Sequence, residues 1–224
     1  MTFSIAGFCR QSGQFGAAVS SSSICVASRC LFTAPGHGAI LTQNVTNPAL
    51  GQRGVKLLSE GLSAEQVLTT LCEQERYPEW RQLLVLDGAG ESAAHSGHET
   101  LGIHAVHRGP DYVVGGNMLA DAAVVRAMGT AFESAEGELA QRLLAAMDAG
   151  AKAGGEMGPV HSAGLQVTDR VSWPVVDLRV DWHDDPLAQL RMLWEKYLPQ
   201  RDDYVCRAAE PDQSPGYGVP GDER

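Results

Sequence analysis

The sequence predicts an α+β fold in which two antiparallel sheets stack face to face and helix pairs flank them, a four-layer αββα sandwich. The first observation is the order of periodic segments: four strands, two helices, three or four strands, two helices, two strands and one helix. The second is that helices come in pairs and never alternate singly with strands, which argues against a doubly wound parallel sheet. The third is the length of 224 residues, which suffices for a core without disulfide or metal support.

The first part of the chain has the pattern of strands joined by turns. Strands are expected at residues 2–9, 15–22, 24–33 and 37–43. Ser12 and Gly13 mark the centre of the first turn, and Pro35 and Gly36 separate the last two strands. The small residues 16–18 indicate that a neighbouring layer packs closely on the second strand.

The period then becomes helical. Asn47 is an expected N-cap, Pro48 takes the first helical position, and the helix ends before Gly61. Ser63 and Gln66 have the spacing of a capping box, which predicts the start of a second helix. These two helices form the first flanking pair.

The remaining sequence continues this arrangement. Further strands are expected at residues 82–87, 91–95, 103–107, 112–115, 163–168 and 175–180. Further helices are expected around residues 124–132, 139–147 and 187–198. Pro199 ends the last helix, and the tail from Glu210 is rich in Pro and Gly and has no periodicity. We expect one domain over residues 1–209 and an irregular C-terminal arm over residues 210–224.

Composition excludes several classes of function. The net charge of −10 disfavours nucleic acid and anionic membranes as partners. The sequence contains no 18-residue apolar stretch and no secretory signal, so we expect no membrane association. The five cysteines are odd in number and form no CxxC pair, which indicates reduced thiols and a cytoplasmic protein. The sequence also lacks the P-loop, GxGxxG, GxSxG and HExxH signatures.

Several stretches resemble one bacterial and archaeal family, domain of unknown function 1028. They are "MTFSIAG", "GAAVSSS", "TQNVTNPALGQRGVKLL", "GLSAEQVL", "GGNML", "DLRVDWHDDPLAQL" and "PGYGVPGDE", and they span essentially the whole chain. The resemblance implies the fold of the N-terminal-nucleophile (Ntn) hydrolases, which is also the fold of proteasome subunits. It supplies no activity, so the chemistry is argued from the residues.

Thr2 is the candidate nucleophile. In Ntn chemistry the first residue of the mature chain attacks the substrate, and its own α-amine acts as general base. An α-amine suits this role at neutral pH because its ordinary pKa is about 7.7–8.0. We therefore expect an amidohydrolase that acts on a small molecule once Met1 is removed. The alternative is that Thr2 only starts a strand and that the protein, with Met1 retained, binds a small molecule without catalysis.

The neighbours of Thr2 follow from the hairpin register. A turn centred on Ser12 and Gly13 places Thr2 opposite Ser23, and a shift of two residues leaves Ser21 or Ser22 beside it. The resemblance to proteasome-like sites implies an acidic residue and a lysine near this strand, and neither is present. The serines could instead merely end the strand.

Side-chain amides complete the candidate site. Gln43 ends a strand and Asn117 follows two glycines, so both are candidate oxyanion donors. The predicted catalytic residues are Thr2, Asn117 and Gln43, and the predicted substrate-binding residues are Ser21, Ser22, Ser23, Asn47 and Arg53. Three of these residues have structural alternatives: helix capping for Asn47, turn formation for Asn117 and simple solvation for Arg53.

Two other polar patterns are weaker candidates for a site. His95, His98, His104 and His107 have a spacing that suggests metal binding, but they lie in strand and loop sequence without a completing cysteine or carboxylate. We expect no metal and no cofactor there. Asp177, Arg179 and Asp181 share one face of a strand and are expected to form a structural ion-pair ladder. We also expect a homo-oligomer, a dimer or larger.

Overall fold

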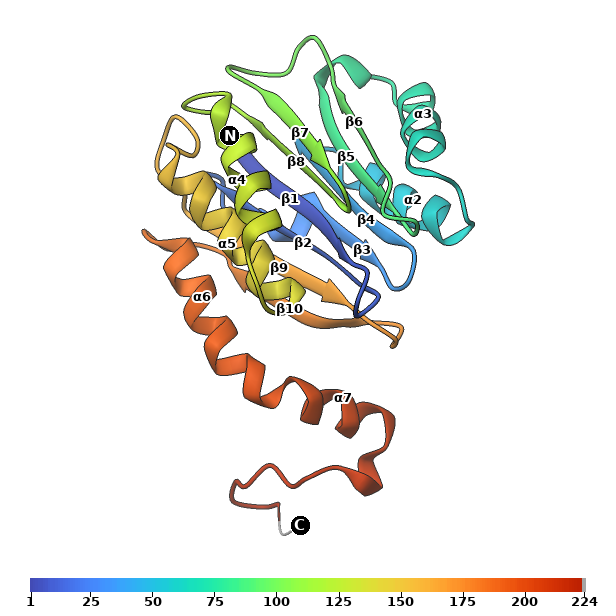
Figure 1. Cartoon of the computed structure of the whole chain (residues 1–224), viewed down its shortest axis with the longest axis vertical. Helices are drawn as coiled ribbons and strands as arrows, with labels where there is room; N and C mark the ends of the chain where they lie inside the picture. The colour runs from blue at the N-terminus through green and yellow to red at the C-terminus, as the bar shows by residue number, and fades with distance from the viewer. Residues whose placement is uncertain (223–224) are drawn as a thin grey trace.

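The computed structural model describes residues 1–222 and consists of four layers (Figure 1). Two antiparallel sheets stack in the middle, with strand orders β10-β9-β2-β1-β8-β7 and β3-β4-β5-β6. Helices α4 and α5 cover the six-stranded sheet, and α2 and α3 cover the four-stranded sheet. The predicted αββα sandwich is therefore confirmed.

The bounds of the elements are as follows. The six-stranded sheet contains β1 (Thr2–Cys9), β2 (Gln14–Ser21), β7 (Ala105–Gly109), β8 (Tyr112–Asn117), β9 (Ser162–Thr168) and β10 (Pro174–Val180). The four-stranded sheet contains β3 (Leu31–Ala34), β4 (Gly38–Asn44), β5 (Arg81–Asp87) and β6 (Ser92–Ser96). The α-helices are α1 (Ala27–Cys30), α2 (Pro48–Ser59), α3 (Ala64–Gln74), α4 (Ala123–Ser134), α5 (Leu139–Lys152), α6 (Pro186–Tyr197) and α7 (Arg201–Ala209).

The helix starts follow the predicted caps. The Asn47 side chain accepts a hydrogen bond from the Ala49 N–H at the start of α2. Ser63 and Gln66 form the reciprocal capping box of α3. The local sequence therefore fixes where both helices begin.

The β1–β2 hairpin lies in the middle of its sheet, as the small residues of β2 suggested. Its register differs by two residues from a turn centred on Ser12 and Gly13, because Cys9 pairs with Gln14. Residues 10–13 form a four-residue loop in which the Gly13 N–H donates to the Cys9 carbonyl. Gly13 closes this loop in the left-handed conformation, with φ at 76°.

The strand expected at residues 24–33 is wrong in its first part. A turn and the short helix α1 replace it, and only Leu31–Ala34 is a strand. Cys25 has a positive φ of 54°, and the Val26 N–H donates to the Ser162 hydroxyl instead of a strand neighbour. Long-range contacts here override the local strand pattern.

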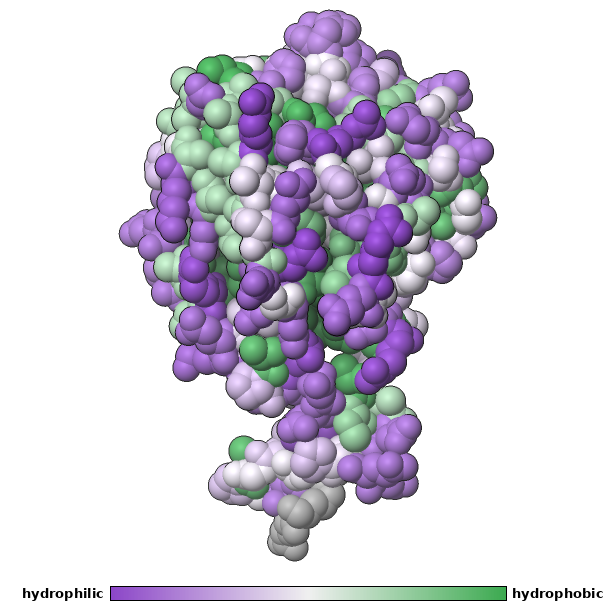
Figure 2. All heavy atoms as spheres, in the orientation of Figure 1, coloured by the Kyte–Doolittle hydropathy of each residue, from purple (hydrophilic) through white to green (hydrophobic). Residues whose placement is uncertain are grey.

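The C-terminal helices also differ in part from expectation. Pro199 does not stop the chain from being helical, because it lies in the 3-10 turn Leu198–Gln200 that leads into α7. A proline is tolerated in the first turn of a helix, where its backbone N–H is not needed. Helix α6 packs on β9 and β10, while α7 and the following residues project away from the layers (Figures 1 and 2).

The core consists of three apolar layers. One lies between the six-stranded sheet and its helices, one between the two sheets, and one between the four-stranded sheet and α2 and α3. None of the helices between residues 1 and 222 has both the length and the apolar character that a membrane span requires.

Candidate functional site

One end of the layer between the two sheets is polar. The polar side chains come from five strands and lie on the faces that the two sheets turn toward each other, while their neighbours along each strand point to the opposite face. They are Thr2, Ser4, Ser21 and Asn117 from the six-stranded sheet and Gln43 and Gln82 from the four-stranded sheet. All six are buried, so we call them the inter-sheet polar cluster.

Thr2 is the outermost β1 member of this cluster. It pairs with Asn117 on β8, and the β1–β2 register places Ser21 opposite it on the other side. Its hydroxyl lies 3.4 Å from that of Ser21, and both hydroxyls donate to the carbonyl oxygen of Met1 at 2.5 Å. Thr2 is only 6% exposed. A carbonyl group is therefore held directly in front of the Thr2 hydroxyl.

An amide network lies behind Thr2 and joins the two sheets. The Gln82 Oε1 atom accepts from Gln43 Nε2 at 2.8 Å and from Asn117 Nδ2 at 3.1 Å. Gln82 Nε2 donates to the carbonyl oxygen of Gly116, and Gln43 Oε1 accepts from the hydroxyl of Ser4. The buried Asn117 Oδ1 has no hydrogen-bond partner among residues 1–222. The network thus orients Asn117 beside Thr2 and leaves part of its hydrogen-bonding capacity unused.

The backbone around Asn117 is held in an uncommon conformation. Met118 follows it with a φ of 47°, in the left-handed region. The Met118 carbonyl accepts from the Met157 N–H at 2.9 Å, and a β-bridge joins Leu119 to Glu156. The loop between α5 and β9 is thereby fixed beside the end of β8.

Glu156 is a buried carboxylate that the sequence analysis missed. It is 5% exposed, and within the described part of the chain neither carboxylate oxygen has a hydrogen-bond partner. The hydroxyl and N–H of Ser22 lie beside it without meeting hydrogen-bond geometry. Burial raises the pKa of Glu156, while the Met1 amino group, Ser22 and His161 offset part of the rise. Glu156 follows two glycines in a loop, so no periodic pattern marks it.

Exposed apolar side chains occur in the segments around Glu156. Met157 follows it in the chain, Ile24 comes shortly after β2, and Trp182 comes shortly after β10. The His161 ring stacks on Trp182 with centroids 4.3 Å apart, and the backbone N–H of His161 donates to the Ser21 carbonyl. Met157, Ile24 and Trp182 are exposed. Glu156 therefore has both polar and apolar surface near it.

The sequence-predicted residues divide into two groups. Thr2, Ser21, Gln43 and Asn117 belong to the inter-sheet polar cluster, and Ser22 lies beside Glu156. Ser23 is exposed, and its N–H donates to the Ser21 hydroxyl.

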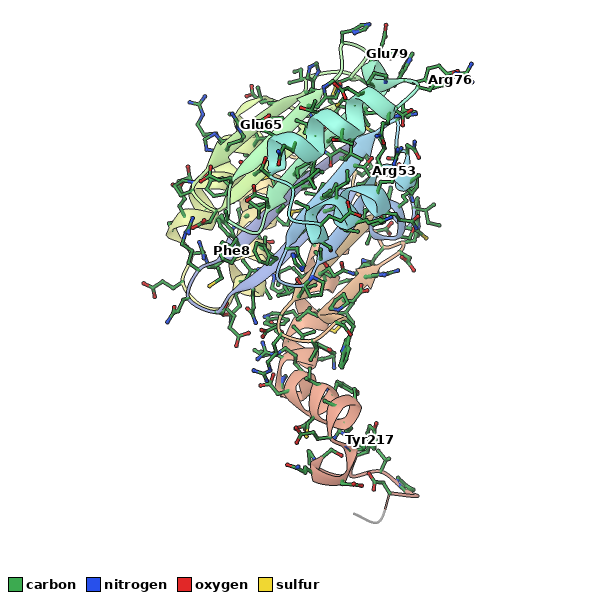
Figure 3. All side chains as sticks on the ribbon, turned by 90° about the vertical axis from the view of Figure 1, so that its right-hand side faces the viewer. Phe8, Arg53, Glu65, Arg76, Glu79 and Tyr217 are labelled. Atoms are coloured by element: carbon green, nitrogen blue, oxygen red, sulfur yellow. The ribbon has the colours of Figure 1, made fainter. Side chains whose placement is uncertain are left out.

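Asn47 and Arg53 form the second group. The Asn47 side chain caps α2 and donates to Glu75, whereas Arg53 donates to Gln74 on α3. Arg53 lies on the helix layer outside the four-stranded sheet (Figure 3). The contacts of these two residues are thus with the helix pair and not with Thr2.

Three histidines of residues 95–107 each make a hydrogen bond to a different partner, and none of these partners is another histidine. His95 contacts the Pro78 carbonyl, His104 the Gly102 carbonyl and His107 the Tyr112 hydroxyl. Within residues 1–222, no group of three or more His, Cys, Asp or Glu side chains has the arrangement of a metal site.

The ladder on β10 contains the expected ion pair. Arg179 Nε and Nη2 donate to the two carboxylate oxygens of Asp177, each at 2.9 Å. Both side chains are partly exposed, so this pair contributes little to stability.

Two comparisons with known proteins point to the same family over most of the chain. The model of the family of unknown function DUF1028 matches residues 2–190. The crystal structure of protein SPO2555 from Silicibacter pomeroyi, which is described by the same family model, superposes with a TM-score of 0.82. It is 30% identical, and 88% of each chain is covered. The ancestral β-subunit Anbu from Yersinia bercovieri is 14% identical, covering 97% of this chain and 100% of its own, with a TM-score of 0.37 that supports no conclusion. No curated protein matches the sequence.

Proposed function

Since the chain belongs to the family of unknown function DUF1028, we propose a function from its geometry: an Ntn amidohydrolase that cleaves an amide bond of a small molecule. Thr2 is the nucleophile once Met1 has been removed. The observation that carries the proposal is the position of Thr2, the first residue of a central strand, with its hydroxyl against a carbonyl group. Strands β2 and β8 pair with β1 on its two sides and supply the rigidity that a terminal nucleophile needs.

The reaction follows the general scheme of nucleophilic catalysis. The Thr2 Oγ1 atom attacks the amide carbon, and the freed α-amine of Thr2 accepts the hydroxyl proton. The amine then passes this proton to the leaving nitrogen as the C–N bond breaks, which leaves an ester on Thr2. Water attacks the ester, releases the carboxylic acid and restores the hydroxyl. Every proton is returned, so no cofactor is needed.

In this proposal the second N–H of Asn117 Nδ2 is the side-chain donor for the developing oxyanion, since the first donates to Gln82 and the unpartnered Oδ1 atom can only accept. Asn117 pairs with Thr2 across the sheet, and Gln82 holds its amide in place. Gln43 is bonded at both ends, to Ser4 and to Gln82, so it acts by positioning Asn117. The Ser21 hydroxyl is a second donor near the carbonyl. Preorganised donors of this kind typically contribute about 10²–10³ in kcat each.

The first prediction concerns Thr2. Thr2→Ala abolishes turnover and leaves the fold intact, whereas Thr2→Ser retains activity because hydroxyl and amine both survive. A variant with an uncleavable N-terminal extension is as inactive as Thr2→Ala, because its general base is acylated. Amide hydrolysis and thermal unfolding are measured side by side. Thr69→Ala, at an exposed position on α3, is the control for losing a threonine. Full activity of the extended variant would rule out the α-amine mechanism.

A specific observation also favours the second candidate, a non-catalytic binding protein. Met1 is well held, since its carbonyl accepts from two hydroxyls. Intact-protein mass spectrometry separates the two functions, because only a chain that starts at Thr2 has the free amine. Retention of Met1 in the protein purified from its own cells would favour the binding protein.

Two properties of the protein stay predictions from its sequence. The reduced cysteines indicate the cytoplasm, and we expect a homo-oligomer. Cell fractionation and light scattering of the purified protein test them.

A further inference from the structure

We infer that the space now occupied by Met1 is the acyl subsite of the enzyme, and that it takes an α-aminoacyl group whose ammonium is received by Glu156. The inference rests on the proposed function and deepens it by naming the substrate class. The predicted substrates are amides of α-amino acids with a free amino group and an apolar side chain.

The carbonyl of Met1 marks the space beside the Thr2 hydroxyl that a scissile carbonyl enters in this inference. Both the Thr2 and the Ser21 hydroxyls donate to its oxygen. Removal of Met1 empties a space the size of one amino-acid residue directly in front of Thr2. Met1 itself therefore indicates the shape and polarity of the group that fits there.

Glu156 gives this space its charge preference. A carboxylate that is 5% exposed without a hydrogen-bond partner is costly, and a cationic ligand offsets that cost. The charge of the Met1 amino group offsets part of the rise in the Glu156 pKa, yet neither carboxylate oxygen has a hydrogen-bond partner within the described residues. The carboxylate is thus still free to receive an ammonium group from a substrate.

The side chain of Met1 indicates the rest of the subsite. A Cβ atom added to Gly158 would lie 3.2 Å from Met1 Cε and 3.7 Å from Met1 Sδ. The absence of a side chain at Gly158 therefore leaves room for an unbranched apolar side chain. The exposed Met157 next to it extends the apolar surface.

Binding and turnover are measured separately so that the two proposals can fail separately. Binding is measured by calorimetry on Thr2→Ala with Met1 removed, and turnover by ammonia release from the protein with Thr2 at its N-terminus. The probes are L-methioninamide and 4-(methylthio)butanamide, which is the same amide without its amino group. We expect L-methioninamide to bind at least about tenfold more tightly.

Variants of Glu156 assign this preference to its carboxylate. Glu156→Gln, combined with Thr2→Ala, abolishes the tenfold preference, and Glu156→Asp retains part of it. Glu60→Gln removes an exposed carboxylate at the end of α2 and is the matched control, with the preference unchanged. Equal binding of the two amides, no binding of L-methioninamide, or a preference that survives Glu156→Gln would overturn the inference. If both amides are hydrolysed equally well, the inference about the ammonium group fails and the proposed function stands. If L-methioninamide binds with the expected preference but no ammonia is released, the proposed function fails and the binding preference stands.

Gly158 supplies an independent test of where the side chain lies. Gly158→Ala adds a methyl group against the space of the Met1 thioether. We expect binding of L-methioninamide to weaken several-fold, while L-alaninamide, whose side chain does not reach this far, is unaffected. An equal loss for both amides would place the side chain elsewhere and overturn this part of the inference.

Discussion

Glu156 and Thr2 lie close to the same residue, Met1, but differ in what burial costs them. Thr2 loses little, because its hydroxyl finds hydrogen-bond partners in Met1 and Ser21. Glu156 keeps two unpartnered oxygens in a buried position. A folded protein tolerates such a group at a site where it serves binding or catalysis, and stability is lost in return.

The pH dependence of stability follows from Glu156. Its pKa is raised in the folded state, so the folded protein holds this proton more tightly than the unfolded chain does. The stability that this bound proton contributes is fully present below the ordinary carboxyl pKa of 4.5. It is lost as the pH rises through the raised pKa of Glu156 in the folded protein. We expect Glu156→Gln to match the parent protein at pH 4 and to exceed its free energy of unfolding by about 1 kcal/mol at pH 8.

Urea unfolding at the two pH values checks this expectation. The titratable groups whose charges act on Glu156 are the Met1 amino group and His161. Glu60→Gln again serves as the control, because its carboxylate is exposed in both states. A Glu156→Gln protein that is less stable than the parent at pH 8 would mean that the carboxylate already has a partner.

At the scale of elements, Gln82 provides one of the side-chain links between the two sheets, beside the Ser4–Gln43 and Thr33–Gln166 hydrogen bonds. Gln82 on β5 contacts Gln43 on its own sheet and Asn117 and Gly116 on β8. Strand β8 is also the neighbour of β1, so the position of Asn117 relative to Thr2 depends on a contact between sheets.

Gln82→Met tests this dependence. The thioether has a similar length but leaves the amide groups of Gln43 and Asn117 and the Gly116 carbonyl without their partner. We expect a loss of about 3 kcal/mol in the free energy of unfolding and about tenfold in kcat. Gln11→Met, in the exposed β1–β2 loop, should change neither quantity. Denaturant unfolding and amide hydrolysis provide the two measurements, and an unchanged kcat would separate Gln82 from the chemistry.

Helices and strands that depend on neighbouring residues in the sequence, such as caps or alternating apolar residues, could be predicted. The caps at Asn47 and Ser63 define helix starts within a few residues, and alternation defines β1. The short helix α1 could not be predicted, because it depends on the hydroxyl of Ser162, which is distant in the chain. Helix α7 could not be predicted either, because a proline usually ends a helix, whereas Pro199 lies in the 3-10 turn that leads into α7.

The candidate site shows the same division. Thr2 and Ser21 could be brought together from the hairpin register, within an error of two residues. Asn117 is a candidate only as an amide after two glycines, and its pairing with Thr2 depends on β8 lying beside β1, which no local pattern indicates. Glu156 could not be predicted, because its loop has no period and its neighbours Met1, Ser22 and His161 come from other parts of the chain. Their catalytic and binding roles stay predictions.

At the scale of the whole molecule, the layered body and the C-terminal segment differ in packing. Helix α7 contains no buried residue, and Arg207 lies over the ring of Tyr217 with 4.1 Å to its centroid. The Tyr197 and Tyr204 rings stack, and Arg201 pairs with Glu138 on the body. Both of these contacts between the segment and the rest of the chain come from residues before 210.

Truncation tests whether one domain ends near residue 209. We expect deletion of residues 210–224 to shift Tm by less than about 2 °C and to leave amide hydrolysis unchanged. Deletion of residues 198–224 should cost more, because it also removes Arg201 and Tyr204 from the body. Thermal unfolding of both truncated proteins measures the difference. A large loss of Tm from the shorter deletion would make the arm part of the domain.

The central place of β1 has a consequence for the timing of synthesis. Thr2 leaves the ribosome first, but its partner Asn117 follows about 115 residues later. At about 5–20 residues per second, the end of β1 waits roughly 6–23 s before β8 is synthesised and can pair with it. An aminopeptidase that trims the nascent chain in this interval meets a free terminus, whereas one that arrives later meets a residue already enclosed on both sides. Under the proposed function, we therefore expect the order of these two events to set the fraction of finished molecules that start at Thr2.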